Sequence, residues 1–324
     1  MAAGKILRAF KAARHGIHTG VELAAVGVFA WIVPRLSRRG ELRLAKAFGS
    51  TAFCFLRRTK RIAMANLDIV YGAEKTRTEK RAMAKTAFIH AVLVFLDYFW
   101  FARDTRARLE KYCVCDDPVM DEWINGSFPG FICTAHIGNW ELAGQYISSR
   151  GRTLWSVYKP IGSRKTLAKL LEFRGRTGQK VIPKEGATTG ILRALRAGNL
   201  AALLLDQHTD LREGGIFLDF FGLPATFSNL AGVISCRMKV PLCVACVRYS
   251  ATDDRYCLKS YGVLSAEETA NMPPEEITKR IASLTGEMIL DNPGQWLWSY
   301  RRWKRCPAGG DISRYPFYAQ REGG

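Results

Sequence analysis

Residues 130–149, GFICTAHIGNWELAGQYISS, decide the fold, because one structural pattern gives way to another within them. Gly130 to Ala135 is a short apolar run that predicts a buried strand, and Trp140 to Ser149 has the pattern of a helix. Between them, Gly138 permits a tight turn and Asn139 can cap the helix that follows. The stretch therefore predicts a strand, a turn and a helix in the order that α/β folds repeat.

The same alternation continues along the chain. Further strands are expected at Thr153 to Tyr158, Lys180 to Ile182, Leu200 to Leu205 and Pro241 to Tyr249. The helices expected between them are Arg164 to Arg176, Thr188 to Arg196 and Asn229 to Met238. This pattern predicts an α/β fold with a central, mostly parallel sheet flanked by helices. Such sheets gather their functional groups at the carboxyl ends of the strands.

The chain before this region is expected to be helical. Candidate helices lie at Glu41 to Leu56, Arg61 to Val70 and Thr78 to Phe101. The third is hydrophobic nearly all round, so we expect it to be buried either in protein or in the surface of a bilayer. We therefore divide the chain into an N-terminal helical, membrane-associating region, residues 1–110, and an α/β domain, residues 111–324.

The first 34 residues suggest how the chain meets a membrane. A basic amphipathic stretch from Lys5 to Arg14 precedes an apolar segment from Gly16 to Pro34. Its uninterrupted apolar part falls short of the roughly 20 residues that a transmembrane helix needs. The segment is therefore expected to be an interfacial helix or a short anchor.

The formal charge of +19 predicts attraction to polyanions. The chain has no zinc-finger spacing, RNP-like aromatic motif or basic-region heptad, so we expect no nucleic-acid partner. Several basic clusters, such as Arg57 and Arg58, instead sit beside apolar residues, as on a protein that binds an anionic membrane surface. The tryptophans between Trp296 and Trp303, interleaved with basic residues, predict either an interfacial anchor or a C-terminal helix docked on the core by its indoles.

The cysteines are scattered without a disulfide-like framework, which indicates a reducing compartment. Cys243 and Cys246 have the spacing of a metal or redox pair, but they lie among Leu, Val and Ala. We interpret them as structural residues of a buried strand.

The candidate chemistry is at His136 and Glu141. The chain lacks a P-loop, a nucleophile elbow, a zinc-binding His-Glu-x-x-His helix and a dinucleotide-binding turn. At the turn after the first predicted strand, Glu141 can fold back against the imidazole of His136. The carboxylate would then orient the ring, and the other ring nitrogen would accept a proton from an attacking hydroxyl. The adjacent helix N-terminus offers backbone amides to an oxyanion or a phosphate.

These residues carry a family resemblance. His136-Ile-Gly-Asn-Trp-Glu141 resembles the His-x4-Asp/Glu block of glycerolipid acyltransferases, in the form found in bacterial lipid A biosynthesis acyltransferases. Later segments resemble further blocks in the usual order. They are the segments around Arg174, Gly190 to Gly198, Leu205 to His208, Phe220 to Ala225 and Asn292 to Lys304.

The resemblance implies an O-acyltransferase that needs no metal or other cofactor. It implies His136 and Glu141 as the catalytic pair, and Asn139, Arg174, Asp206 and Gln207 as substrate-binding residues. The acyl donor would be an acyl-carrier protein or acyl-CoA thioester, and the acceptor a glycolipid, best known as a lipid A precursor. The expected location is the cytoplasmic face of the bacterial inner membrane.

Three alternatives stay open at this stage. The acceptor could be another lipid, such as a lysophospholipid or an aminolipid. The transferred group could be aminoacyl rather than fatty acyl. The chain could also be a basic membrane-binding protein that keeps the fold without catalysis.

Overall fold

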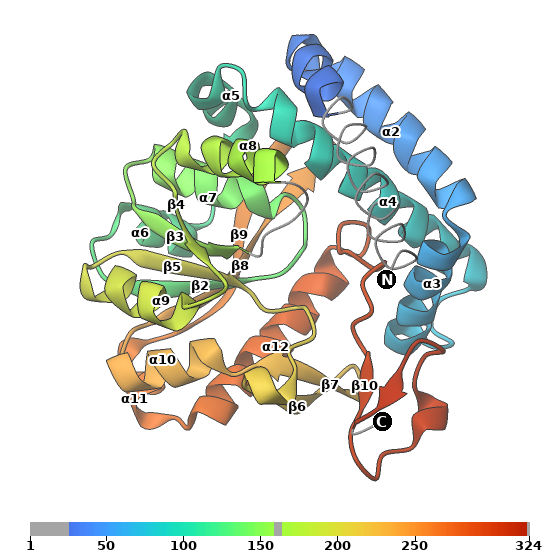
Figure 1. The fold of residues 1–324 in the computed structure, drawn as a ribbon, viewed down its shortest axis with the longest axis vertical. Helices are drawn as coiled ribbons and strands as arrows, with labels where there is room; N and C mark the ends of the chain where they lie inside the picture. The colour runs from blue at the N-terminus through green and yellow to red at the C-terminus, as the bar shows by residue number, and fades with distance from the viewer. Residues whose placement is uncertain (1–25, 159–163, 323–324) are drawn as a thin grey trace, which may run out of the picture.

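The computed structural model describes residues 26–158 and 164–322. At its centre is a sheet to which the described residues contribute seven strands, in the order β1-β9-β8-β2-β5-β3-β4 (Figure 1). In that order the strands are Cys113–Val114, Arg255–Leu264, Leu242–Ser250, Gly130–Thr134, Leu200–Leu204, Leu154–Tyr158 and Lys180–Pro183. Neighbouring strands are parallel except β8 and β9, which pair antiparallel. The predicted α/β fold with a mostly parallel sheet is confirmed.

The central strands send alternate side chains into two cores. In β2, Phe131 and Cys133 belong to one core and Ile132 to the other. This burial on both faces explains why the strands are continuous apolar runs. The first core is covered by α9 (Ala187–Arg196), α10 (Leu230–Met238) and α12 (Pro274–Asp291). The second is covered by α5 (Thr105–Tyr112), α6 (Pro118–Asn125) and α7 (Trp140–Ser149), with α8 (Arg164–Gly175) packed beside α7.

A layer of N-terminal helices lies beside the sheet (Figure 1). It comprises α2 (Arg38–Phe55), α3 (Arg57–Tyr71) and α4 (Arg77–Trp100), preceded by helical residues 26–32 and the 3-10 turn η1 (Val33–Arg35). The stretch from Lys5 to Arg14 lies outside the described residues, as does the first part of the apolar segment. Within the described chain, α4 is long and apolar enough to cross a membrane, but 44% of its most apolar window is buried. Because α4 packs into both cores, protein accounts for much of that burial.

The C-terminal tryptophans are core residues. The side chains of Trp296, Trp298 and Trp303 are at most 2% exposed, and each indole N–H donates a hydrogen bond inside the protein. The segment from 293 to 304 forms turns rather than a helix. Both the interfacial anchor and the helix predicted for these residues are therefore wrong, although the docking of the indoles on the core is confirmed.

The remaining elements are short or were not predicted. An antiparallel hairpin, β6 (Gly215–Phe220) and β7 (Leu223–Ser228), follows the loop after β5. The others are η2 (Leu211–Glu213), α11 (Ala266–Asn271), η3 (Ile312–Arg314) and the parallel pair β10 (Arg305–Cys306) and β11 (Gln320–Arg321).

Candidate active site

The turn between β2 and α7 is held on several sides. The Asn139 side chain caps α7 by accepting a hydrogen bond from the Leu142 amide at 3.2 Å. Gly138 has a φ of +57°, and a Cβ there would lie 1.8 Å from the carbonyl oxygen of Val247. The carbonyl of His136 accepts a hydrogen bond from Leu297 at 3.1 Å. The Asn139 side chain and these backbone contacts together hold the backbone that carries the imidazole.

His136 pairs with Asp206. In the parallel register of β2 and β5, Thr134 lies level with Leu204, so residues two positions later meet at the edge of the sheet. Asp206 Oδ1 lies 2.8 Å from His136 Nδ1, and Asp206 Oδ2 accepts from the His136 amide at 3.0 Å and from Trp296 Nε1 at 2.8 Å. Although burial opposes ionisation, His136 and the indole lower the pKa of Asp206. The carboxylate is thus charged and oriented to hold Nδ1–H, leaving Nε2 as the basic nitrogen.

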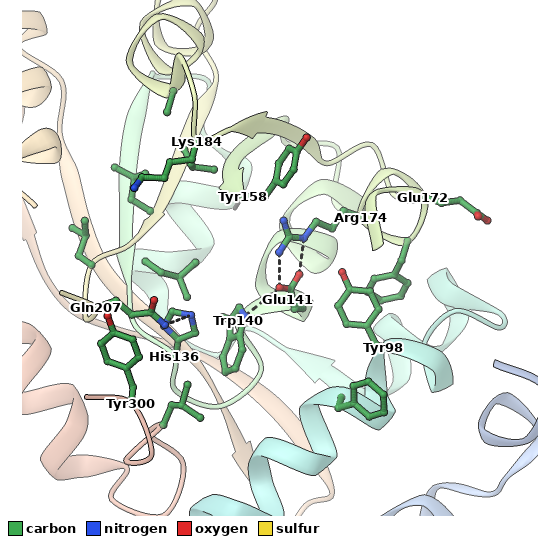
Figure 2. Close-up of a pocket in the computed structure, with 18 of the residues that line it drawn as sticks. Tyr98, His136, Trp140, Glu141, Tyr158, Glu172, Arg174, Lys184, Gln207 and Tyr300 are labelled. Carbon is green, nitrogen blue, oxygen red and sulfur yellow. Dashed lines mark hydrogen bonds and ion pairs between the residues drawn. The ribbon is translucent and has the colours of Figure 1, made fainter. Parts of the chain in front are cut away.

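Glu141 does not pair with the imidazole. Its carboxylate accepts two hydrogen bonds from Arg174, from Nε at 2.8 Å and from Nη2 at 2.6 Å, and one from Trp140 Nε1 at 3.1 Å. Figure 2 shows Trp140 between His136 and Glu141, and the rings of Trp140 and His136 are 4.8 Å apart. The expectation that Glu141 folds back against His136 is therefore wrong for this structure, because α7 points the carboxylate toward α8. Arg174 is likewise committed to Glu141, so its charge is largely neutralised.

The Nε2 edge of the imidazole faces polar groups of the loop after β5. Gln207 Nε2 is 3.3 Å from His136 Nε2. The next residue, His208, donates from its backbone amide to the Tyr300 hydroxyl at 3.1 Å, and its Nδ1 is 2.7 Å from the Thr226 hydroxyl. Burial, together with nearby lysine and arginine side chains, lowers the pKa of His208. His208 is therefore neutral at neutral pH.

His136 lines a cavity of about 1150 Å³ whose two ends differ in character. At one end, the wall formed by the N-terminal helices is mostly apolar, with Val26, Ala30, Pro34, Phe95 and Phe99, and the charged side chains of Arg103, Arg174 and Arg176 line the cavity beside it. The other end is polar, with Lys184, His208, Thr209, Glu213, Ser228 and Tyr300. Its volume exceeds the range typical of pockets for small ligands. The cavity can therefore hold an apolar chain and a polar group together, with the imidazole between them.

Comparison with known proteins shows the family of the chain. Residues 10–305 match the family described as bacterial lipid A biosynthesis acyltransferase. The chain belongs to this acyltransferase family. The match includes every residue of the site described above, from the N-terminal helices to Trp296 and Tyr300.

Several curated relatives carry acyltransferase names. The chain is 22% identical over 273 residues to the lipid A biosynthesis palmitoleoyltransferase of Escherichia coli, covering 82% of this chain and 85% of that protein. A lipid A biosynthesis acyltransferase of Shigella flexneri matches to the same extent. A phosphatidylinositol mannoside acyltransferase of Mycobacterium tuberculosis is 25% identical over 107 residues, 32% of this chain and 34% of that protein. The chain thus matches only about a third of the mycobacterial relative's length.

Two residues expected to bind substrate in this acyltransferase lie behind the site. Asn139 is fully buried, and while its oxygen caps α7, its Nδ2 donates to Asp97 at 2.8 Å. Asp206 is 3% exposed and serves the imidazole. Arg174 and Gln207 do line the cavity. Of the four residues expected to bind substrate, only Arg174 and Gln207 are therefore placed to contact it directly.

Sequence reasoning missed several residues of the site. Trp296 lies in the segment Asn292 to Lys304, but nothing in its spacing indicates a bond to a carboxylate 90 positions earlier. Tyr98 lines the cavity beside Glu141 and Arg174, hidden in an apolar helix (Figure 2). Asp97 had a usable signal, because a lone carboxylate among apolar residues of a helix needs a buried partner.

Proposed function

We propose that the chain is an O-acyltransferase that moves a fatty acyl group from a carrier thioester to a hydroxyl of a membrane glycolipid, most simply a lipid A precursor. The observation that carries this proposal is the His136–Asp206 pair, whose imidazole lines a large cavity between the mostly apolar wall of the N-terminal helices and the polar residues near Lys184 and Tyr300. Family membership supports the same chemistry.

The geometry supports general-base catalysis. With Nδ1–H bonded to Asp206, Nε2 accepts the proton of the acceptor hydroxyl, which displaces the Gln207 amide from that nitrogen, as the hydroxyl oxygen attacks the thioester carbonyl carbon. The new C–O bond gives a tetrahedral oxyanion, to which the Gln207 amide can donate a hydrogen bond. Collapse breaks the C–S bond, and the leaving thiolate takes the proton from the imidazolium. The products are an ester and a free thiol, and Asp206 stays ionised throughout.

The two ends of the cavity suit the two substrates. The acyl chain would lie in the apolar end, between Phe95 and Phe99 of α4 and the helical residues 26–32. The acceptor headgroup would lie in the polar end, where Lys184, His208 and Tyr300 offer hydrogen bonds. The donor would be an acyl-carrier protein or coenzyme A thioester, both of which are acidic and suit a chain with a charge of +19.

The acceptor is the finer part of the proposal. The relatives that match most of the chain are named for lipid A biosynthesis, which favours a lipid A precursor. The mycobacterial name favours a second candidate, a phosphatidylinositol mannoside type of glycolipid. Both acceptors are membrane lipids with polar, hydroxyl-rich headgroups.

We further propose a place on the cytoplasmic face of the inner membrane, reached through the N-terminal helical region, residues 1–110, and the surface of this region supports attachment to a membrane. Large apolar side chains are exposed along this layer: Val28, Trp31, Ile32, Phe48, Phe55, Leu56 and Phe95. Phe29 packs against both Phe48 and Phe95, which joins part of this patch to the apolar end of the cavity. The exposed charges of α2 are all basic, namely Arg39, Arg43 and Lys46. Apolar contact with lipid tails and attraction to anionic headgroups would act together here.

Lipid mass spectrometry tests the proposal. Bacterial cells that express the wild-type chain should accumulate a glycolipid heavier by one fatty acyl group, and cells that express His136→Ala should not. An aminoacyl increment, or an acylated lysophospholipid or aminolipid, would overturn the assignment of group or acceptor. If the two lipid profiles were the same, the chain would be a membrane-binding protein without this activity.

A further inference from the structure

Asp97 is a buried carboxylate outside the cavity. It lies on α4, is fully buried, and is absent from the cavity wall. Its oxygens accept hydrogen bonds from Arg38 Nη1 at 2.6 Å, from Asn139 Nδ2 at 2.8 Å and from the Tyr256 hydroxyl. A charge in such a place is costly unless its bonds are complete, so the three donors and the carboxylate depend on one another.

Arg38 brings this network to the first described long helix, α2. The guanidinium also donates to Glu41 at 2.8 Å. Five aromatic rings surround it at 5.3 to 6.0 Å, those of Trp100, Phe101, Tyr112, Tyr249 and Tyr256. These rings come from the end of α4, from α5 and from strands β8 and β9, so they hold the guanidinium in place. Arg38 in turn holds Asp97 in one position relative to the sheet.

Asn139 brings the network to the active site. It lies three positions after His136, and its backbone N–H donates to Val247 at 2.9 Å. The oxygen of its side chain fixes the start of α7, while the nitrogen reaches Asp97. A displacement of Asn139 would therefore move the turn that holds the imidazole against Asp206. Catalysis by positioned groups loses rate steeply when they shift by about 1 Å.

We propose that Asp97 is a positioning residue for acyl transfer: through Asn139 it sets where the turn after β2 places the His136 ring, and Arg38 holds it there. This inference rests on the proposed function for its kinetic consequence, but its structural consequence is independent of the reaction.

The test replaces Asn139 by aspartate. Asn139→Asp keeps an oxygen that can cap α7, but it puts a second carboxylate 2.8 Å from Asp97 in place of the N–H donor. We expect kcat at pH 8 to fall about 10- to 100-fold with KM within about twofold of wild type. Because burial raises the pKa of Asp97, the two carboxyl groups come to share a proton as the pH is lowered. The ratio of variant to wild-type kcat should then rise, because the repulsion between the two carboxylates is relieved. Protonation of the general base lowers kcat of both proteins and does not raise this ratio.

Thr269→Val is the matched control. The Thr269 side chain is fully buried on α11 and donates to Val240 at 3.0 Å, far along the chain from the site. Loss of the Thr269 hydroxyl also removes a buried hydrogen bond, so Thr269→Val should lower the melting temperature. The substitution should leave kcat and its pH profile unchanged. If Asn139→Asp does not fold, Asn139→Ser replaces it. Serine caps a helix but is too short to reach Asp97, so kcat should fall without recovery at low pH.

An NMR measurement separates this inference from the proposed function. In full-length protein labelled with ¹⁵N-histidine, the imidazole shifts of His136 report the Nδ1–H bond to Asp206 whether or not the chain transfers acyl groups. We expect them to change in Asn139→Asp and not in Thr269→Val. Unchanged His136 shifts in Asn139→Asp, or a kcat within twofold of wild type, would overturn the positioning role.

Discussion

At the scale of single residues, Asp206 decides which nitrogen of His136 is basic. It bonds both the ring Nδ1 and the backbone amide of His136, so it fixes the ring as well as its tautomer. The indole of Trp296 completes the carboxylate's bonds and excludes water from it. The base is therefore a pair whose members come from neighbouring strands.

Asp206→Asn should abolish most of the activity. The amide can donate to Nδ1, which would put the ring proton on Nε2 and leave no acceptor for the substrate hydroxyl. We expect kcat to fall about 10²- to 10⁴-fold with little change in KM, measured as initial rates of acyl transfer. Glu141→Gln is the matched control, and it should retain far more activity. The opposite ranking would restore Glu141 as the partner of His136.

Glu141→Gln should act mainly on stability. Arg174 and Glu141 are 11% and 10% exposed at their side chains, so removal of one charge leaves the other poorly solvated. We expect a loss of about 3 kcal/mol in the free energy of unfolding, measured by urea denaturation. Glu141→Gln with Arg174→Gln should recover much of that loss. A double variant no more stable than the single one would contradict this account of the pair.

Several residues of the site could be chosen from the sequence, but their pairing could not. His136, Glu141, Arg174 and Gln207 all reach the cavity, as strand-end and helix positions indicate. The partner of His136 was assigned to Glu141 because the two lie close along the chain. The contact with Asp206 depends on the register of β2 and β5, which has no local signal in either strand.

At the scale of elements, α4 joins the N-terminal layer to the catalytic turn. Besides Asp97, it carries His90, a buried imidazole that bonds to the backbone of Gly138. Burial lowers the pKa of His90 to about 4, and the charge of Arg38 adds to that effect. The folded protein therefore keeps this ring neutral where an unfolded chain would protonate it.

His90 should make the fold sensitive to acid. Between its ordinary pKa near 6.5 and its folded value near 4, the unfolded state binds a proton that the folded state does not. Stability is therefore complete above pH 6.5 and falls as the pH drops toward 4, by up to about 3 kcal/mol. Between pH 7 and pH 4.5, the free energy of unfolding measured with urea should fall less for His90→Gln than for wild type. Equal losses would mean that His90 is not buried neutral.

Most elements with a strong apolar pattern were predictable. The β2, β3, β4, β5 and β8 strands and the helices between them appear within a few residues of their expected bounds. The β6–β7 hairpin was missed because its turn uses Phe221 and Gly222, both with positive φ, and a phenylalanine there is unusual. The segment from Trp296 to Trp303 was misassigned because its alternation of indoles and basic residues is the same whether the indoles are buried in the protein or lie at a membrane interface.

At the scale of the whole molecule, charge and apolar surface meet on the N-terminal layer. Leu56 is 51% exposed, and Arg57 and Arg58 follow it on the surface. The layer also borders the apolar end of the cavity, so a bound membrane would bring lipid tails near the site. The proposed docking thus links the excess positive charge to the chemistry.

Neutralising two of these arginines should weaken membrane binding. Each basic residue near an anionic surface contributes about 1 kcal/mol, so Arg57→Gln with Arg58→Gln should reduce binding to phosphatidylglycerol vesicles about 10- to 30-fold at low salt. Lys279→Gln with Arg280→Gln makes the same charge change on the exposed side of α12. Vesicle sedimentation should show little effect of that control. Similar losses for both pairs would indicate that net charge, and not this surface, governs binding.

The most direct test of the central claim is the rate of acyl transfer by purified wild-type and His136→Ala protein, from an acyl-carrier thioester to a lipid A precursor in mixed micelles. We expect ester formation by wild type and a loss of at least about 10²-fold in the rate of the variant, with thermal unfolding unchanged. A variant that transfers the acyl group as fast as wild type would contradict the claim.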